Sequence, residues 1–281
     1  MPATPRYGTV DRDYAIRLAT TAPEHDGPIW MVNLMNYREV AQYEDGREST
    51  ISGREADDLY APIDILAEIG ARPVFFADVD QQLLGDAPIW DRVAVVKYPT
   101  RRSFIDMQTR PDFQEAHKHK DAGMQQTIVI GCQPMPYPQR PADAIFPDWA
   151  DVPFPPTQGD GPVTVVHVLR FQDPEAANIS PDAMEAYTST AAVVASKHGV
   201  RVAGWFAVEG TIVGDGRAWH QVRFNQFPSK RAFMAVVADP VRLEAQKTYR
   251  EKAIADTYTV AVRPSIDLIA ASIGDGAASL A

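Results

Sequence analysis

Two apolar, β-rich stretches of the sequence each carry one polar side chain near the middle. The stretch "VTVVHVLRF" carries His167, and "IWMVNLMNY" carries Asn33 at the corresponding place. Burying an unpaired polar group costs about 1–3 kcal/mol, so each side chain needs a hydrogen-bond partner or a wet cavity. An imidazole also exchanges protons near neutral pH. His167 is therefore a candidate general acid or base; the alternative is a core histidine with both ring nitrogens hydrogen-bonded.

A second polar set lies in the stretch "WHQVRFNQFP", which begins at Trp219. Successive side chains of a strand point to opposite faces, so Gln221, Arg223 and Asn225 share one face with Trp219. A guanidinium stays charged and can hold a carboxylate or a developing oxyanion. We therefore predict that Arg223 acts in catalysis with His167, while Gln221 and Asn225 bind substrate.

The interleaved residues Val222 and Phe224, like Val93 and Val95 in "WDRVAVVKYP", are apolar and favour packing under helices. This assignment makes the polar face the lining of a cavity. The alternative is a solvent-exposed face of an open sheet. The other predicted substrate-binding residues, the aromatic ones as flat walls, are Asn33, Arg170, Trp90, Trp219, Trp205 and Phe76.

The chain also repeats itself at an offset of 129 residues. Residues 70–126 align with 199–255 without a gap, and 14 of the 57 pairs are identical. Two similar units in tandem explain this better than chance. The pairs include Gly70/Gly199, Gly85/Gly214, Trp90/Trp219, Pro99/Pro228, Pro111/Pro240 and Glu115/Glu244.

Each unit has the same order of structural signals. A β-rich run is followed by an amphipathic helix that stops at a glycine, and the second of these helices is predicted to have Ser180 as its N-cap. A hairpin across a Gly-Asp turn, a helical stretch broken at Pro111 or Pro240, and a last strand complete the unit. The order β-α-β-β-α-β is that of a ferredoxin-like unit. We predict an α+β fold in which two tandem ferredoxin-like units form an intrachain dimeric α+β barrel, with a cavity between the sheets.

Nine prolines between residues 134 and 162 favour a stiff, extended connector. The predicted organisation is an N-terminal extension with a short helix at 1–27, unit 1 at 28–136, a proline-rich linker at 137–160, unit 2 at 161–270 and a tail at 271–281.

Composition narrows the class of protein. The formal charge is −10 and no basic cluster is present, which disfavours nucleic-acid and membrane-surface partners. No apolar run reaches membrane length, so we expect a soluble, cytoplasmic protein. The single cysteine, Cys132, has apolar neighbours and is predicted to be a packed thiol. Glu115 and His119 have a chelating spacing but are predicted to form a solvated helix face; no metal or cofactor is predicted.

Several motifs of unit 1 resemble a known family. They are Asn33-Leu34 followed by an aromatic-Arg-Glu sequence, the stretch from Tyr43 to Gly46, Ser52-Gly53, and "YPTRRSFIDMQTRPDFQEAHKHKDAGM". Unit 1 resembles the family called domain of unknown function 1330, in the dimeric α+β barrel superfamily; unit 2 resembles it more weakly. The resemblance implies an interior site, because the superfamily includes muconolactone isomerases, cofactor-free monooxygenases, haem-binding chlorite dismutases and aldoxime dehydratases. The reaction stays open, because a fold supports many chemistries.

These observations favour a small-molecule enzyme. The main hypothesis is cofactor-free acid–base chemistry, as in an isomerase, cyclase or lyase, on a hydrophobic aromatic or lactone-like substrate. One alternative is a cofactor-free monooxygenase or a haem-dependent dehydratase, for which His198 is the candidate haem ligand. Another is a non-catalytic protein that binds a hydrophobic metabolite. We expect a homodimer, with a monomer as the alternative.

Overall fold

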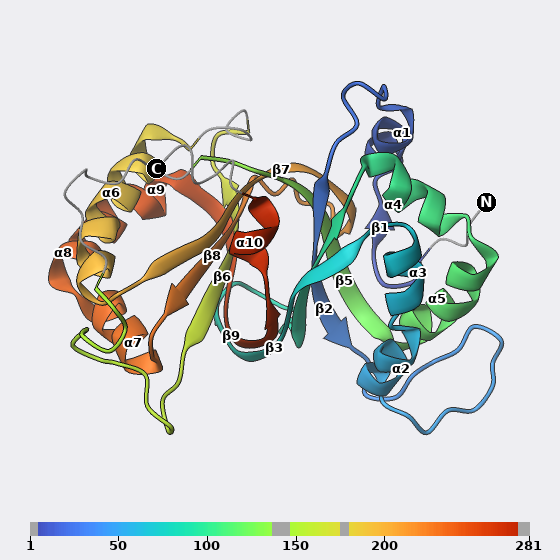
Figure 1. Cartoon of the computed structure of the whole chain (residues 1–281), viewed down its shortest axis with the longest axis horizontal. Coiled ribbons are helices and arrows are strands. Elements are labelled where there is room, and N and C mark those ends of the chain that lie inside the picture. Colours follow the sequence, from blue (N-terminus) through green and yellow to red (C-terminus); the bar gives the residue numbers. More distant parts are fainter. Residues whose placement is uncertain (1–4, 137–146, 175–179, 275–281) are drawn as a thin grey trace. The chain divides into compact units, whose positions relative to one another are not determined.

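The computed structural model describes residues 5–136, 147–174 and 180–274. Parts of the predicted N-terminal extension, linker and tail therefore lie outside the described residues. The chain divides into two units (Figure 1). Unit 1 comprises Met1–Asp78, Ala87–Gln133 and Glu209–Ala218, and unit 2 comprises Val79–Asp86, Pro134–Val208 and Trp219–Ala281.

Both units have the predicted β-α-β-β-α-β order. The elements that build unit 1 are β1 (Thr9–Val10), α1 (Arg12–Thr20), β2 (Ile29–Tyr37), α2 (Gly53–Tyr60), α3 (Ile63–Glu68), β3 (Arg72–Leu84), β4 (Arg92–Tyr98), α4 (Arg101–Gln108), α5 (Pro111–Gly123) and β5 (Met124–Pro134). Those of unit 2 are β6 (Val163–Phe171), α6 (Asp182–Lys197), β7 (Arg201–Gly214), β8 (Gln221–Phe227), α7 (Lys230–Ala238), α8 (Pro240–Ala245), the π-helical turn η1 (Gln246–Arg250), α9 (Glu251–Ala253), β9 (Ile254–Asp267) and α10 (Ile269–Ile273).

The sheet of each unit has the ferredoxin-like strand order. Unit 1 has β5-β2-β4-β3, and the end of β7, from Glu209, lies beside β5 with β1 at its far edge. Unit 2 has β9-β6-β8-β7, and the end of β3, from Val79, lies beside β9. The long strands β3 and β7 therefore contribute to both units. None of the described helices combines the length and apolar character needed to cross a membrane.

Local sequence explains most helix boundaries. Ser52 and Thr100 cap α2 and α4 in capping boxes, and Pro111 and Pro240 occupy the first turns of α5 and α8. The prediction for Ser180 is wrong, because α6 begins at Asp182 and its start has no side-chain cap. The Ser180 hydroxyl instead lies within hydrogen-bonding distance of two side chains of β8.

The faces of the two sheets are opposite to those predicted. In unit 2, Val165 packs with Val194 of α6 and Val236 of α7. His167 lies two residues after Val165 and pairs with Arg223 across the strands, so both side chains lie on the face that the helices cover. In Figure 1, α6, α7 and α8 cover this sheet.

Unit 1 has the same arrangement. Met31 and Val96 pack with Leu66 of α3 and Met107 of α4, so their face is the helix-covered one. Arg92 shares this face and contacts α2. The residues predicted to pack under the helices lie on the opposite faces and are fully buried: Val93, Val95, Val222 and Phe224. His167, Arg223 and Arg92 therefore lie between a sheet and its own helices, not on the other face as predicted.

The last helical stretch of unit 2 contains one extra residue. Pro111 and Pro240 are 129 residues apart. Met124 and Ile254, which pair with Tyr37 and Phe171 at equivalent places, are 130 residues apart. The turn η1 accommodates the additional residue, and such single π-helical turns are frequent at functional sites. The ungapped sequence alignment is therefore one residue out of register at its end.

The close crossing of α2 and α5 in unit 1 allows a test of packing. A Cβ added to Gly53 would lie 2.2 Å from the Gly123 carbonyl oxygen, and one added to Gly123 would lie 2.3 Å from the Gly53 carbonyl oxygen. We expect Gly53→Ala to lower the free energy of unfolding by about 1–3 kcal/mol in urea denaturation. Gly27→Ala, with nothing within 4 Å, is the control and should change it by about 0.5 kcal/mol or less. Equal effects of the two substitutions would contradict this account.

Candidate active site

Arg223 lies on β8 beneath α6, with 5% of its surface exposed. Its Nε and Nη2 donate to Gln221 Oε1 at 3.1 and 2.5 Å. Its Nη1 lies 3.4 Å from Thr188 Oγ1, and its Nη2 lies 3.4 Å from Ser180 Oγ. The guanidinium also lies over the Trp205 ring, 3.8 Å from its centroid. All of these partners are uncharged.

The described surroundings of Arg223 contain further positive charge and no acid in contact. Within the described part of unit 2, no carboxylate lies within ion-pairing distance of Arg223. Burial, together with the charge of Arg250 on η1, lowers the pKa of Arg223, and Tyr187 of α6 opposes this shift. Arg250 lies 6.0 Å from the Tyr187 ring centroid. A buried guanidinium with cations around it and no acid partner favours an anionic ligand.

His167 faces Arg223 from β6. Its Nδ1 lies 3.1 Å from Thr259 Oγ1, which leaves Nε2 with no protein partner among the described residues. Burial lowers the pKa of His167 to about 3, and the charges of Arg250, Arg223 and Arg242 add to this effect. The imidazole is therefore neutral at neutral pH and can accept a hydrogen bond or a proton at Nε2 once Nδ1 carries the hydrogen.

Two further observations indicate open space and an unused donor beside Arg223. His167 and Asn225 are partly exposed although they lie mid-strand on a helix-covered face, whereas Val166 and Val168 on the other face are sealed. The buried Trp205 Nε1 has no hydrogen-bond partner in the described part of the chain. An orphaned buried donor is costly, so it suits a ligand that accepts a hydrogen bond. We call Arg223, His167, Trp205, Tyr187 and Arg250 the Arg223 cluster.

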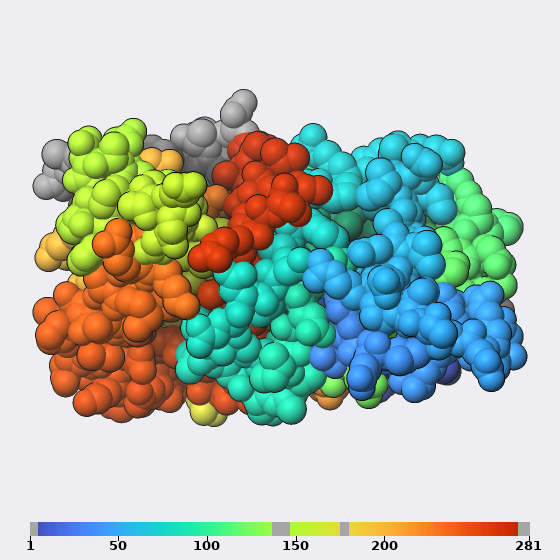
Figure 2. Space-filling model, turned by 90° about the horizontal axis from the view of Figure 1, so that it is seen from below, coloured from blue at the N-terminus to red at the C-terminus, as the bar shows by residue number. Residues whose placement is uncertain are grey.

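A shallow, mostly apolar groove of about 470 Å³ runs between α6 and the α8–η1 stretch. The same helical segments carry Tyr187 and Arg250. In the space-filling view, orange atoms of the α7–α8 region lie at the surface of unit 2 on the side that is shown (Figure 2). The residues that line the groove are Thr190, Pro240, Val241, Glu244, Ala245, Thr248 and Tyr249.

Two residues of unit 2 that were predicted to bind substrate lie apart from this cluster. Arg170 has the opposite strand parity to His167 and forms an ion pair with Asp256. Trp219 packs against Tyr258 with ring centroids 5.3 Å apart, and Tyr258 also lies on the face opposite His167. Neither side chain therefore belongs to the Arg223 cluster: Arg170 is in an ion pair and Trp219 is in an aromatic contact.

The remaining predicted residues belong to unit 1 and have partners there. The Asn33 side-chain amide donates to the Met31 carbonyl of its own strand at 3.1 Å. The Phe76 ring lies under the guanidinium of Arg92, 4.4 Å from the ring centroid, and Trp90 is buried. These three residues therefore lie in unit 1, apart from the Arg223 cluster. The predicted residues that share one sheet face of unit 2 are Arg223, His167, Trp205, Gln221 and Asn225.

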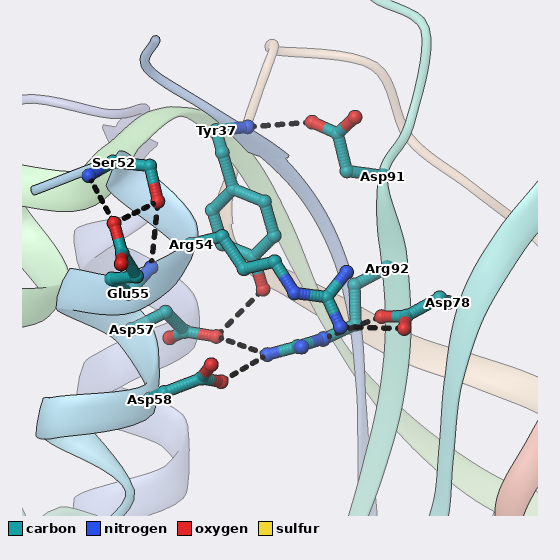
Figure 3. A network of polar contacts seen from close by, with 9 residues as sticks. All are labelled: Tyr37, Ser52, Arg54, Glu55, Asp57, Asp58, Asp78, Asp91 and Arg92. Atoms are coloured by element: carbon teal, nitrogen blue, oxygen red, sulfur yellow. Dashed lines mark hydrogen bonds and ion pairs between the residues drawn. The ribbon is translucent and has the colours of Figure 1, made fainter. Parts of the chain in front are cut away.

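Arg92 is the buried arginine of unit 1, and acids surround it (Figure 3). Its Nη1 donates to Asp57 at 3.1 Å and to Asp58 at 3.0 Å, and its Nε donates to Asp78 at 3.0 Å. The Tyr37 hydroxyl donates to Asp57 at 2.7 Å. Burial alone would lower the pKa of Arg92, but Tyr37 and the carboxylates raise it. Arg92 is therefore compensated within the protein.

Sequence reasoning missed several of these residues. Two of the three acids of the Arg92 network, Asp57 and Asp58, are adjacent in "EADDLY", and their position on the helix that covers the strand was the available signal. The third, Asp78, lies on β3. In unit 2 it missed Ser180 as a ligand, together with Thr188, Thr259, Arg242 and Arg250. The hydroxyl residues Ser180, Thr188 and Thr259 carry no distinctive sequence signal, because their partners Arg223 and His167 are distant in the sequence.

Other predictions concern single residues. Cys132 is buried, and burial raises the pKa of its thiol, which confirms a packed cysteine. Glu115 forms an ion pair with Lys118, and the His119 Nδ1 lies 2.7 Å from the Tyr43 hydroxyl. The residues that the structure describes contain no group of three or more potential metal ligands. The ring of His198 stacks on Phe154.

The two buried arginines should differ in their effect on stability. Arg92→Met leaves Asp57 buried without its cation, so we expect it to lower the free energy of unfolding by about 3–5 kcal/mol. Arg223→Met removes a desolvated charge that has no acid partner among the described residues of unit 2, so we expect a loss of about 1 kcal/mol or less, or a gain. Urea denaturation measures both variants. A loss at Arg223 as large as that at Arg92 would contradict the assignment of Arg223 to ligand binding.

The protonation of His167 gives a pH test. Its folded-state pKa of about 3 lies below the ordinary value of 6.5, so the unfolded state takes up the proton first as the pH falls. This contribution to stability is complete above about pH 6.5 and is lost as the pH falls toward 3. Between pH 7 and pH 4.5, we expect the wild type to lose about 2 kcal/mol more than His167→Asn in urea denaturation. A His167 titration midpoint near 6.5 by NMR would contradict the lowered pKa of this residue.

Comparisons with known proteins bear on the fold. No family model and no curated protein matches the chain. A protein of unknown function from Rhodopseudomonas palustris is 25% identical over 46% of this chain and 97% of its own, with a TM-score of 0.40. An anthrone oxidase-like protein is 12% identical over 88% of this chain and 97% of its own, with a TM-score of 0.52. A chlorite dismutase mutant from Candidatus Nitrospira defluvii is 14% identical over 92% of this chain and 98% of its own, with a TM-score of 0.44.

The strand order of each unit and the similarity to the anthrone oxidase-like protein lead to the same fold. The predicted fold class is confirmed: the chain is an α+β protein of the dimeric α+β barrel fold, with two tandem ferredoxin-like units.

Proposed function

We propose that the Arg223 cluster binds a small hydrophobic molecule, aromatic or lactone-like, that carries a carboxylate or develops an oxyanion. The chain is then an enzyme of cofactor-free acid–base chemistry, such as an isomerase, cyclase or lyase. The observation that carries the proposal is the buried guanidinium of Arg223, which has no carboxylate partner among the described residues of unit 2. A ligand anion supplies the missing negative charge.

Arg223 and Trp205 form the anion-binding part of the proposed site. Gln221 and the Trp205 ring hold the guanidinium in one orientation, so little conformational entropy is lost when an oxyanion binds. The unpaired Trp205 Nε1 is a second donor. The groove between α6 and η1 accepts the apolar part of the substrate.

His167 is the proposed proton carrier. Its pKa of about 3 reflects burial first and then the charges of Arg250, Arg223 and Arg242. A bound anion compensates these charges and raises the pKa of His167 toward the range in which a general base works. Nε2 then takes a proton from one substrate atom and returns it to another, while Thr259 holds Nδ1. Arg223 stabilises the oxyanion formed between the two transfers.

We also propose that unit 1 is a member of the domain of unknown function 1330 family. The support is the set of motifs around Asn33, from Tyr43 to Gly46 and at Ser52-Gly53. Ser52 caps α2 and Gly53 lies against α5, so the last of these motifs serves the fold. The family proposal does not depend on the reaction.

Ligand binding tests the anion site. We expect isothermal titration to detect benzoate binding at least tenfold tighter than binding of uncharged benzamide. Arg223→Gln should weaken benzoate binding at least tenfold. Arg170→Gln is the matched control, because this arginine lies on the opposite face in an ion pair, and it should leave the affinity unchanged. Equal affinities for the two compounds, or unchanged benzoate binding by Arg223→Gln, would overturn the proposal.

Turnover tests the catalytic part. In a screen of aromatic lactones and enolisable aromatic acids, we expect His167→Gln to lower kcat by about 100-fold or more. Its affinity for benzoate should change little, because Arg223 carries the binding energy. If bound compounds return chemically unchanged, the proposal of an enzyme is wrong and the protein is a binding protein. If oxygen is consumed during turnover, the reaction is a cofactor-free oxidation and not acid–base chemistry.

A further inference from the structure

Unit 1 contains a buried amine that the proposed function does not use. Lys120 of α5 is 8% exposed. Its Nζ lies over the Tyr60 ring, 5.1 Å from the centroid, and within the described part of the chain it forms no ion pair or hydrogen bond. A buried ammonium normally has a carboxylate partner. The burial of Lys120 without one therefore calls for an explanation.

Polar and aromatic groups that can move protons lie around this amine. The His117 ring lies 5.9 Å from the Tyr60 ring, and its Nε2 lies 2.8 Å from the Tyr7 hydroxyl. Burial, and then the charge of Lys120, lower the pKa of His117 to about 4, while Asp121 opposes the shift. The imidazole is thus neutral at neutral pH, and burial raises the pKa of Tyr60, so that its hydroxyl keeps its proton.

Open space adjoins the middle of the unit 1 sheet on the same face. Asn33 and Ala94 pair across β2 and β4, and both are partly exposed although helices cover this face. On the opposite face of the same strands, Val32, Leu34 and Val95 are sealed. The helix-covered layer of unit 1 is therefore not completely filled.

The internal repeat relates Lys120 to Arg250. Each lies four residues before the residue that begins the pairing of the last strand, Met124 or Ile254. Each also faces the tyrosine of the first helix, Tyr60 in unit 1 and Tyr187 in unit 2. A guanidinium remains a cation at this place, whereas an amine can lose its proton and become a nucleophile.

We propose that Lys120 is a nucleophilic amine that binds small hydrophobic aldehydes or ketones as a Schiff base in unit 1. The Nζ lone pair attacks the carbonyl carbon, and the carbonyl oxygen takes up a proton to form a carbinolamine. Loss of the hydroxyl as water, with the remaining N–H proton released, then forms the imine. No electron transfer is needed, and hydrolysis reverses the reaction. This site is independent of the Arg223 cluster.

The electrostatic surroundings agree with this role. Burial lowers the pKa of Lys120, although the charge of Asp57 opposes the shift. A larger fraction of the amine is then unprotonated at neutral pH than for an exposed lysine. Lys118 on the same helix provides the contrast, because it is exposed and pairs with Glu115 at 2.5 Å.

Reductive trapping tests the proposal on the intact full-length chain. The protein is incubated at pH 7 with benzaldehyde and sodium cyanoborohydride, which adds hydride to the imine, and peptides are then mapped by mass spectrometry. We expect benzylation of Lys120 at least tenfold faster than that of Lys118. Labelling of Lys118 at an equal or higher rate, or no label on Lys120, would overturn the proposal.

Two controls separate reactivity from simple access. Lys120→Arg keeps the positive charge over Tyr60, so it should lose the rapid label while the labelling of Lys118 stays unchanged. Formaldehyde in place of benzaldehyde measures access for the smallest carbonyl compound. Fast labelling of Lys120 by formaldehyde but not by benzaldehyde would rule out a hydrophobic substrate class. Wild-type benzoate binding by Lys120→Arg distinguishes this site from the proposed site of unit 2.

Discussion

A charge buried between a sheet and its helices must be compensated, and the two units of this protein meet that requirement differently. Arg92 is enclosed by Asp57, Asp58 and Asp78, so its charge is balanced within unit 1. Arg223 has the same kind of location in unit 2, but its contacts there are uncharged. The first arginine belongs to the framework. The second retains a positive charge that a ligand can use.

The two repeated units share a sequence pattern but carry different charged side chains between the sheet and its helices. Lys120 and Arg250 occupy equivalent places on the last helical stretch, and each faces a tyrosine of the first helix. Only unit 2 contains the extra residue of η1, whose last member is Arg250. Unit 1 therefore presents an amine over Tyr60, and unit 2 presents a guanidinium near His167. The two interiors can differ in chemistry while the strand order of the units stays the same.

Much of this organisation could be predicted, because strand alternation and helix stop signals are local properties. The grouping of Gln221, Arg223 and Asn225 on one face follows from the two-residue period alone. The pairing of His167 with Arg223 on that face comes from the register of β6 and β8, and His167 lies outside the repeat of residues 70–126 and 199–255. Local pattern could not decide which face the helices cover, because both faces are buried and a row of valines is compatible with either neighbour. The predictions for Val222 and Phe224 are wrong for this reason.

The sequence by itself determined the order of elements, the tandem repeat, the packed thiol of Cys132 and the residues that share each strand face. Those features depend on neighbours along the chain or on composition. Only the tertiary structure decided that Arg92 meets three acids while Arg223 meets none among the described residues of its unit, and that Arg170 is ion-paired. It also decided that Lys120 is buried with no ion pair or hydrogen bond in the described part of the chain. The reason is physical: the free energy of a buried charge depends on groups from distant parts of the chain, and their distances exist only after folding.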